Sequence, residues 1–157
     1  MGFGELMTIR PAERSDLPAL LPLRESLWPD TARDHHRREL EQTLATKTSG
    51  PYPCALFVSD AGGGSVVGFV EVGLRSHADG CDPDQPVGYL EGWYVAEPWR
   101  GQGVGRALVE AAENWARGQG CVEMASDTWI HNEGSQHAHE ALGYAVVDRC
   151  VNFRKRL

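Results

Sequence analysis

The sequence predicts a single mixed α/β domain, in which helices pack against one central sheet. Short apolar runs typical of strands alternate with segments whose apolar residues recur every three or four positions, as in helices. The 157 residues are enough for one hydrophobic core and too few for two. Hydrophobic residues make up 41% and charged residues 24%, which is ordinary for a globular protein. The expected order of elements is β-α-α-β-β-β-α-β-α-β.

The N-terminal part is predicted to hold one strand and two helices. The strand covers residues 8–12. Ser15 is a good N-cap for a helix that carries the apolar residues of 17–27, and Pro22 inside that run predicts a kink or a break. The polar segment 31–46 is expected to form a second, exposed helix.

The rest of the chain is predicted to form five strands and two helices. The glycine-rich segment Ala61–Ser65 reads as a hairpin turn between two strands. Val104, Leu108, Ala111 and Trp115 recur at helical spacing. The expected strands are 54–60, 66–75, 87–95, 121–126 and 144–154, and the expected helices are 103–118 and 134–142.

Composition narrows the function classes. The formal net charge of −7 argues against nucleic acid as a partner and is compatible with a cationic ligand. No apolar stretch is long enough to span a membrane and no secretory signal opens the chain, so we expect a cytoplasmic protein. The first six residues read as a tag or an alternative start. Four scattered cysteines without a CxxC pair indicate reduced thiols, and the histidines show no metal-ligand spacing, so we expect no metal.

The most informative motif is a glycine-rich segment between a predicted strand and a predicted helix. Its glycines let the backbone approach a ligand closely, and amide groups at a helix N-terminus bind phosphate. The alternative is a glycine-rich turn that merely opens a helix. The preceding Glu-Pro-Trp and the amphipathic helix that follows favour the phosphate site. The segment reads Arg100, Gly101, Gln102, Gly103, Val104, Gly105.

This segment resembles the Arg-x-x-Gly-x-Gly pyrophosphate loop of the GNAT acetyltransferases, and the resemblance extends from about Thr8 to the end of the chain. It implies a GNAT fold: a mixed central sheet with a splayed parallel strand pair and helices on both faces. It also implies acetyl-CoA as co-substrate, with the pyrophosphate on the amides of Gln102 to Gly105 and Arg100 at the mouth. The pantetheine arm would pair with the strand that carries Trp93, Tyr94 and Val95. An amide near Val95 would polarise the thioester carbonyl.

Further segments are similar to the aminoglycoside 6′-N-acetyltransferases within that superfamily. This resemblance implies an aminoglycoside amino group as acceptor, and hence antibiotic resistance. The segments are Leu27-Trp28-Pro29, Gly80-Cys81-Asp82, Leu90-Glu91-Gly92, the run from Glu123 to Thr128, and Phe153-Arg154-Lys155-Arg156.

The chemistry of such an acceptor agrees with the acidic residues near the predicted cleft. Several ammonium groups require carboxylates, and sugar rings pack on aromatic faces. We expect Glu91, Asp127 and Asp148 to bind the acceptor, with Asp82 as a weaker candidate and Trp28 as an aromatic wall. The alternatives are a solvated charge for Glu91, a turn residue for Asp127 and core packing for Trp28.

Acetyl transfer requires an amine that has lost its proton and a thiolate that gains one. Asp127 and Glu91 are the candidate proton acceptors. His139 occupies the position, four residues before Gly143-Tyr144, where many family members carry a tyrosine acid. It is therefore a candidate proton donor, or a residue that only orients CoA.

Two other functions stay open from the sequence. One is acetylation of another amine, such as a polyamine, an amino sugar or a peptide N-terminus. The other is an acyl-CoA-binding sensor without turnover. The family resemblance also suggests a homodimer formed through the C-terminal strands.

Overall fold

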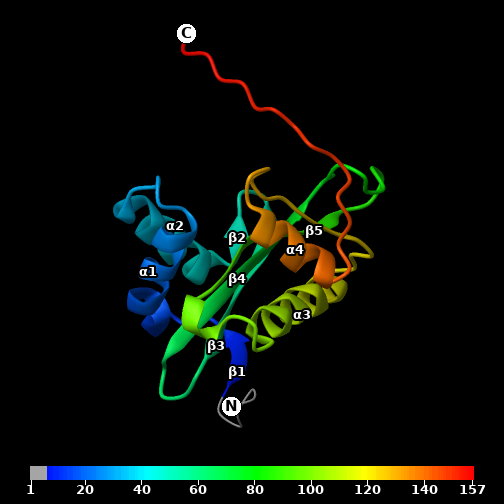
Figure 1. Cartoon of the computed structure of the whole chain (residues 1–157). Coiled ribbons are helices and arrows are strands. Elements are labelled where there is room, and N and C mark those ends of the chain that lie inside the picture. The colour runs from blue at the N-terminus through cyan, green and yellow to red at the C-terminus, as the bar shows by residue number, and fades with distance from the viewer. Residues whose placement is uncertain (1–6) are drawn as a thin grey trace.

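The computed structural model describes residues 7–157, so the suggested tag or alternative start lies outside the described residues. Helices α1 (Leu17–Leu27) and α2 (Arg33–Thr46) cover one face of the central sheet, and α3 (Val104–Gly118) and α4 (Glu133–Ala141) lie on the other (Figure 1). The strands are β1 (Thr8–Pro11), β2 (Thr48–Ser49), β3 (Tyr52–Asp60), β4 (Val66–Arg75), β5 (Val87–Val95) and β6 (Met124–Ser126). The predicted mixed α/β architecture is confirmed.

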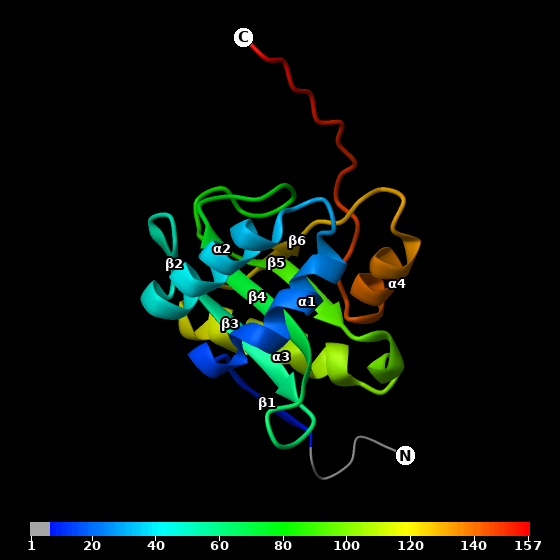
Figure 2. The same ribbon diagram turned by 90° about the vertical axis from the view of Figure 1, so that its left-hand side faces the viewer.

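The order of strands across the sheet is β1-β3-β4-β5-β6, with β2 paired to β3 (Figure 2). All pairs are antiparallel except β5 and β6, which run parallel. The parallel ladder pairs Gly88 with Met124 and ends where Leu90 pairs with Ser126, although β5 continues to Val95. The expected splayed strand pair is therefore present, and residues 91–95 have one edge free of β6.

The hydrophobic core consists of two clusters, one on each face of the sheet. Leu20, Leu21 and Phe69 lie between the sheet and α1, whereas Val70 and Leu108 lie between the sheet and α3. Neighbouring residues of β4 thus contribute to opposite clusters, as the two-residue period of a strand requires. The same alternation decides which strand residues face α1 and which face α3 in the site described below.

The beginning of α1 differs from the prediction. Ser15 lies within a short 3-10 turn (Arg14–Asp16), and Asp16 occupies the N-cap position of α1. Pro22 neither breaks nor ends the helix. A proline in a helix removes one backbone hydrogen bond, and here the burial of Leu20 and Leu21 offsets that loss.

Two predicted strands near the C-terminus also differ. The expected strand 121–126 shrinks to β6, because the turn after α3 extends to Cys121, whose amide donates to the carbonyl of Ala116 at 3.0 Å. The expected strand 144–154 is absent. Residues 145–157, called the C-terminal tail below, carry no helix or strand; Val147 lies against Gly80 in the loop between β4 and β5, and the end of the tail projects from the body of the molecule (Figures 1 and 2). A strand needs a partner edge, and the tail finds none within one copy.

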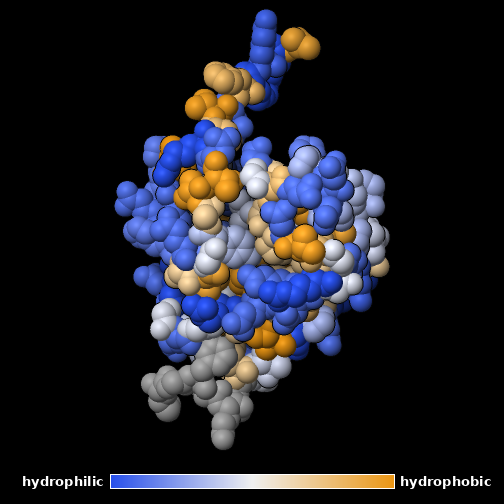
Figure 3. Space-filling model, turned by 90° about the vertical axis from the view of Figure 1, so that its right-hand side faces the viewer, coloured by the Kyte–Doolittle hydropathy of each residue, from blue (hydrophilic) through white to orange (hydrophobic). Residues whose placement is uncertain are grey.

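The tail is strongly apolar for an exposed segment. Val146, Val151 and Phe153 are 53%, 76% and 92% exposed. Hydrophobic and hydrophilic side chains follow one another along its projecting part (Figure 3).

Within residues 7–157, no helix combines the length and apolar character that a bilayer crossing requires. The four cysteine thiols are free. The described part of the chain also contains no group of three or more His, Cys, Asp or Glu side chains arranged to hold a metal ion.

Candidate active site

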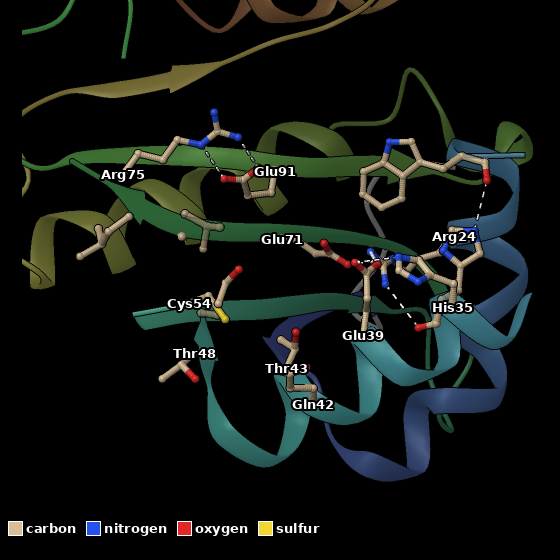
Figure 4. A pocket seen from close by; sticks show the side chains of 18 of the residues that line it. Arg24, His35, Glu39, Gln42, Thr43, Thr48, Cys54, Glu71, Arg75 and Glu91 are labelled. Atoms are coloured by element: carbon tan, nitrogen blue, oxygen red, sulfur yellow. Dashed lines mark hydrogen bonds and ion pairs between the residues drawn. The ribbon is translucent and has the colours of Figure 1, made fainter. Parts of the chain in front are cut away.

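A cleft of about 600 Å³ opens on the face of the sheet that α1 and α2 cover. Strands β3, β4 and β5 form its floor, and the two helices form one wall (Figure 4). Trp28 and Glu91, both predicted as acceptor-binding residues, line it. Glu39 and Glu71, which the sequence analysis did not single out, supply two further carboxylates.

Arg24 organises the inner end of this cleft. It follows Leu17, Leu20 and Leu21 on the buried side of α1, and its side chain is 6% exposed. Its guanidinium lies 2.9 Å from Glu39 and 3.0 Å from Glu71, with both carboxylates turned toward it (Figure 4). The same group lies 4.9 Å from the centre of the Trp28 ring. A single buried cation therefore holds two carboxylates and an aromatic ring in place.

Glu71 has an unusual protonation equilibrium. Its side chain projects from an otherwise apolar strand and is 19% exposed. Burial raises the pKa of Glu71, Arg24 opposes this shift, and the nearby carboxylates Glu39 and Glu91 add to it, so that together they bring the pKa to about 7. Glu71 therefore changes charge near neutral pH, and a cationic ligand would favour its ionised form.

Trp28 packs directly against the backbone of β5. A Cβ atom at Gly92 would lie 2.6 Å from Cη2 of Trp28, so only glycine leaves room for the ring. The indole also stacks on His36, whose Nε2 lies 3.2 Å from the backbone oxygen of Trp28. Trp28 thus packs against the sheet and also lines the cleft, while its contact with an acceptor stays a prediction.

A chain of polar contacts leads from Glu91 to Asp127. Arg75 donates two hydrogen bonds to Glu91, at 2.9 and 2.8 Å, and lies 3.5 Å from the centre of the Tyr89 ring. The Tyr89 hydroxyl donates to Asp127 Oδ1 at 2.6 Å. Burial, followed by this contact, raises the pKa of Tyr89 well above its ordinary value, so the hydroxyl stays protonated and remains a donor.

A β-bulge places Glu91 in the cleft. Glu71 pairs with Gly92 while its neighbour Val72 pairs with Leu90, which leaves Glu91 as the extra residue of β5. A bulge turns a side chain away from its regular direction. Glu91 and Gly92 consequently both face the α1 side, where Glu91 lines the cleft and Gly92 contacts Trp28.

The glycine-rich segment lies at the N-terminus of α3, on the other side of the sheet. Gly101 and Gly103 have φ values of 72° and 86°, in the left-handed region that glycine adopts without strain. The Ala107 amide donates to the Gly103 carbonyl, and the amides of the preceding turn remain available to a ligand. Nothing lies within 4 Å of a Cβ atom built on Gly101, so the loop has open space beside it. These features suit a phosphate-bearing ligand.

Side chains around this loop are fixed to the protein. Arg100 Nε donates to the Val95 carbonyl at 2.8 Å, and its guanidinium lies 5.2 Å from the Tyr94 ring. Gln102 donates to the Pro98 carbonyl at 3.0 Å.

The side chains of the apolar residues next to this loop pack against the protein, so any contact with a ligand is left to their backbone groups. The side chains of Val95 and Val104 belong to the core, and that of Tyr94 packs on the α1 side. Trp93 packs closely against Gly105, where a Cβ atom would lie 3.0 Å from its ring. The Trp93 indole N–H is buried without a protein acceptor.

His139 lies near the end of β6 and contacts protein groups through both ring nitrogens. Nε2 is 2.8 Å from Ser126 Oγ, and Nδ1 is 2.7 Å from the Ser135 carbonyl oxygen. The ring packs edge-on against Trp93 and Tyr144, with centroids 5.3 and 5.8 Å away. The hydroxyl of Tyr144 is directed elsewhere, because it donates to Glu113.

Two predicted acceptor residues are not brought to the cleft. Asp82 lies in the exposed loop between β4 and β5, where its side chain accepts from the Asp84 amide at 2.9 Å. Asp148 lies in the C-terminal tail and accepts from the Arg149 amide at 2.7 Å. Both carboxylates accept from nearby backbone amides and neither lines the cleft of one copy, so their role in acceptor binding stays a prediction.

The residues that the sequence analysis missed carried a visible signal. Arg24 stands seven residues after Leu17 on an apolar helical face, and Glu71 is the single charge inside the strand before Arg75. A charged residue at a buried position is almost always paired. The buried position of Arg24 therefore indicated an acidic partner, and the buried position of Glu71 indicated a basic one.

Comparison with known proteins agrees with this geometry. Residues 17–144 match the acetyltransferase (GNAT) family. The chain is 43% identical over 149 residues to the aminoglycoside N(6′)-acetyltransferase type 1 of Klebsiella aerogenes, covering 95% of this chain and 96% of that protein. It is 43% identical over 150 residues to the protein of the same name from Stenotrophomonas maltophilia, covering 96% and 94%. This chain therefore belongs to the GNAT family of acetyltransferases.

Solved structures give the same result. The aminoglycoside N-acetyltransferase AAC(6′)-Iy in complex with CoA superposes with a TM-score of 0.86, at 34% identity over 100% of this chain and 99% of that one. AAC(6′)-Iy in complex with the bisubstrate analogue CoA-S-monomethyl-acetylneamine gives a TM-score of 0.84, at 35% identity over 96% and 99%.

Glu71 gives a prediction about stability and pH. Its pKa is raised from 4.5 to about 7 on folding, so between these values the unfolded chain is ionised while the folded chain still holds the proton. The free energy of unfolding of the wild type should therefore fall, relative to Glu71→Gln, as pH rises through this window, by on the order of 3 kcal/mol. Urea denaturation at pH 5 and pH 8 measures the difference, with Glu110→Gln on the exposed side of α3 as control. Parallel pH dependences of the wild type and Glu71→Gln would contradict the prediction.

Proposed function

We propose that this chain transfers an acetyl group from acetyl-CoA to the 6′-amino group of aminoglycosides and thereby confers resistance to them. The observation that carries the proposal is the arrangement around the free edge of β5. A carboxylate-lined cleft lies on one face of the sheet and a phosphate-type loop on the other, and between them the pairing of β5 with β6 ends at Leu90 and Ser126. The names of the relatives support the same reaction.

The residues of the glycine-rich segment fit acetyl-CoA. The amides of Gln102 to Gly105 lie at the positive end of α3, where Gln102 and Gly103 are exposed, and they suit a pyrophosphate. Residues 93–95 offer backbone groups along the free edge of β5, where a pantetheine arm can pair. Bound there, acetyl-CoA supplies the acetyl thioester, and the amide of Val95 is our candidate for polarising its carbonyl.

The cleft suits a ligand with several ammonium groups. Glu39, Glu71 and Glu91 provide three carboxylates against the guanidinium groups of Arg24 and Arg75. Both arginines are paired with these carboxylates. Because a carboxylate can accept about four hydrogen bonds, each acid still has lone pairs for the ammonium groups of a ligand. Trp28 offers an aromatic edge beside β5 for a sugar ring.

We assign to Asp127 the role of accepting the proton that the attacking amine loses. The bidentate contact from Arg75 holds the Glu91 carboxylate in a fixed orientation, which suits it to positioning an ammonium group. Asp127 accepts one hydrogen bond, from Tyr89, and is otherwise exposed. It can therefore accept a proton from the attacking amine, directly or through water. His139, on the opposite side of the sheet, is assigned to the supply of a proton for the leaving thiolate.

One assay separates this function from the two others considered. Release of free CoA is measured with kanamycin-type aminoglycosides and with simple polyamines, and the position of acetylation is determined on the product. We expect turnover with the aminoglycosides and acetylation at the 6′ nitrogen. Preference for polyamines would favour another amine as acceptor, and binding of acetyl-CoA without any release of CoA would favour a sensor.

We further propose that the protein works in the cytoplasm as a homodimer. Free thiols at all four cysteines suit a reducing compartment. The tail presents apolar residues on an extended backbone, and β6 is the last strand of its sheet. The tail of one copy can therefore add a strand to the sheet of the other, and this exchange buries side chains that one copy leaves exposed.

Asp127→Asn tests the assignment of the proton acceptor. The amide keeps the size of the side chain and can still accept from Tyr89, but it cannot take up a proton. We expect kcat/KM for aminoglycosides to fall about a hundredfold, in the range typical for loss of a general base, with unchanged affinity for acetyl-CoA. Asp79→Asn in the exposed loop is the control. Full turnover of Asp127→Asn, combined with a lower melting temperature, would instead identify a turn-capping residue.

Val151→Asp tests the dimer. The charge would be buried in an exchanged strand, whereas in the exposed tail of a monomer it is tolerated. We expect sedimentation analysis to show a dimer for the wild type and mainly monomer for the variant. Tyr52→Asp, at a 37% exposed site on β3 and away from β6, should stay dimeric. A wild-type monomer at micromolar concentration would exclude the exchange.

A further inference from the structure

Two consecutive residues at the end of β6 face opposite sides of the sheet. Ser126 forms the last pair of the parallel ladder with Leu90, whose side chain belongs to the core beside α3. Asp127 contacts Tyr89, the neighbour of Leu90, on the cleft side. The two-residue period of a strand produces this division. The carboxylate therefore lies on the acceptor side and the hydroxyl on the side of α3 and α4.

The Ser126 hydroxyl lies where the two parallel strands part. Its oxygen is 3.5 Å from the Leu90 carbonyl, at the last rung of the ladder, and 2.8 Å from His139 Nε2. Beyond this rung, residues 91–95 of β5 have the free edge to which acetyl-CoA was assigned. The hydroxyl is thus the side-chain donor at the entrance to the gap.

His139 has no nitrogen left for a direct contact with a ligand. A carbonyl oxygen only accepts hydrogen bonds, so the Nδ1 atom next to the Ser135 carbonyl carries a hydrogen. Nε2 is directed at Ser126. Packing against Trp93 and Tyr144 restrains the ring in this orientation. Any proton that leaves the ring through Nε2 therefore passes first to the Ser126 oxygen.

We propose that Ser126 is the catalytic residue that protonates the sulfur of departing CoA, and that His139 acts through it. The inference rests on the proposed acetyl transfer. As the carbon–sulfur bond breaks, the Ser126 O–H proton moves to the sulfur. Protonated His139 passes its Nε2 proton to the Ser126 oxygen in the same step. His139 becomes neutral and keeps its Nδ1–H on Ser135. After CoA leaves, a proton from solvent returns to Nε2 through the Ser126 oxygen, and it balances the amine proton that Asp127 releases to solvent.

The competing explanation is that Ser126 only anchors α4 to the sheet through His139. Both explanations require the same hydrogen bond, so loss of activity alone does not separate them. They differ in whether the hydroxyl senses the sulfur atom of CoA. They also differ in whether the effects of substituting Ser126 and His139 on kcat are independent of each other.

The decisive measurement compares CoA with desulfo-CoA, which lacks the sulfur, by calorimetry without any acceptor present. We expect the wild type to bind CoA about five- to tenfold more tightly than desulfo-CoA, the value of one hydrogen bond. Ser126→Ala should bind the two ligands equally, and Ser126→Thr, which keeps the hydroxyl, should restore the preference. Equal losses of affinity for both ligands in Ser126→Ala would identify an anchor and overturn the proposal.

Kinetics supply the second measurement. Ser126→Ala and His139→Gln should each lower kcat about a hundredfold with small changes in both KM values, and the double variant should lose no more than either single one. Ser76→Ala in the exposed loop is the control. Multiplied losses in the double variant would show independent roles and overturn the relay. If the wild type binds CoA with the stated preference but does not acetylate aminoglycosides, the proposed acceptor fails while the assignment of Ser126 stands.

Discussion

Strands β5 and β6 stop exchanging hydrogen bonds after Leu90 and Ser126, while β5 remains bound to β4 as far as Val95. Unpaired backbone groups in the middle of a sheet are costly unless a ligand or water satisfies them. The free edge of β5 is therefore the constraint around which the other parts of the site are arranged. The bulge at Glu91, the glycine at position 92 and the glycine-rich turn before α3 all lie within the stretch of chain that follows the last rung.

The acceptor side depends on a buried cation as much as on its carboxylates. Without Arg24, the ionised forms of Glu39 and Glu71 would repel each other at the inner end of the cleft. With Arg24 in place, the carboxylates converge while Glu71 still exchanges its proton near neutral pH. A site of this kind adjusts its charge to that of the ligand, because an incoming ammonium group favours loss of the Glu71 proton.

Much of the fold and of the donor site was predictable from the sequence because both depend on local patterns. The helical spacing around Leu108 and the glycines before Val104 fix an element and its ligand end within a short window. The pair formed by Arg24 and Glu71 was missed because it joins residues far apart in the chain. Asp82 and Asp148 do not line the cleft of one copy, because acidity alone does not say where a carboxylate points.

The last predicted strand failed for a different reason. Its residues have the composition of a strand, but composition does not supply the edge to which a strand must pair. In the described chain the tail does not pair with the open edge of β6, and it stays extended and exposed. The tail of a single copy thus has the residue composition of a strand without the pairing of one. In Val66–Arg75 and Val87–Val95, by contrast, both the composition and the pairing are those of a strand.

The alternation at the end of β6 also limits how the length of this chain can change over time. Inserting one residue between Met124 and Ser126 would turn the hydroxyl toward the cleft and the carboxylate toward α4, exchanging the chemical character of the two faces. Inserting two would restore the facing but displace both groups by about 7 Å along the strand. The turn at 119–121, by contrast, can absorb extra residues outside the strand. Insertions and deletions among descendants of this sequence should therefore accumulate between the end of α3 and Met124, and they should avoid the three residues of β6.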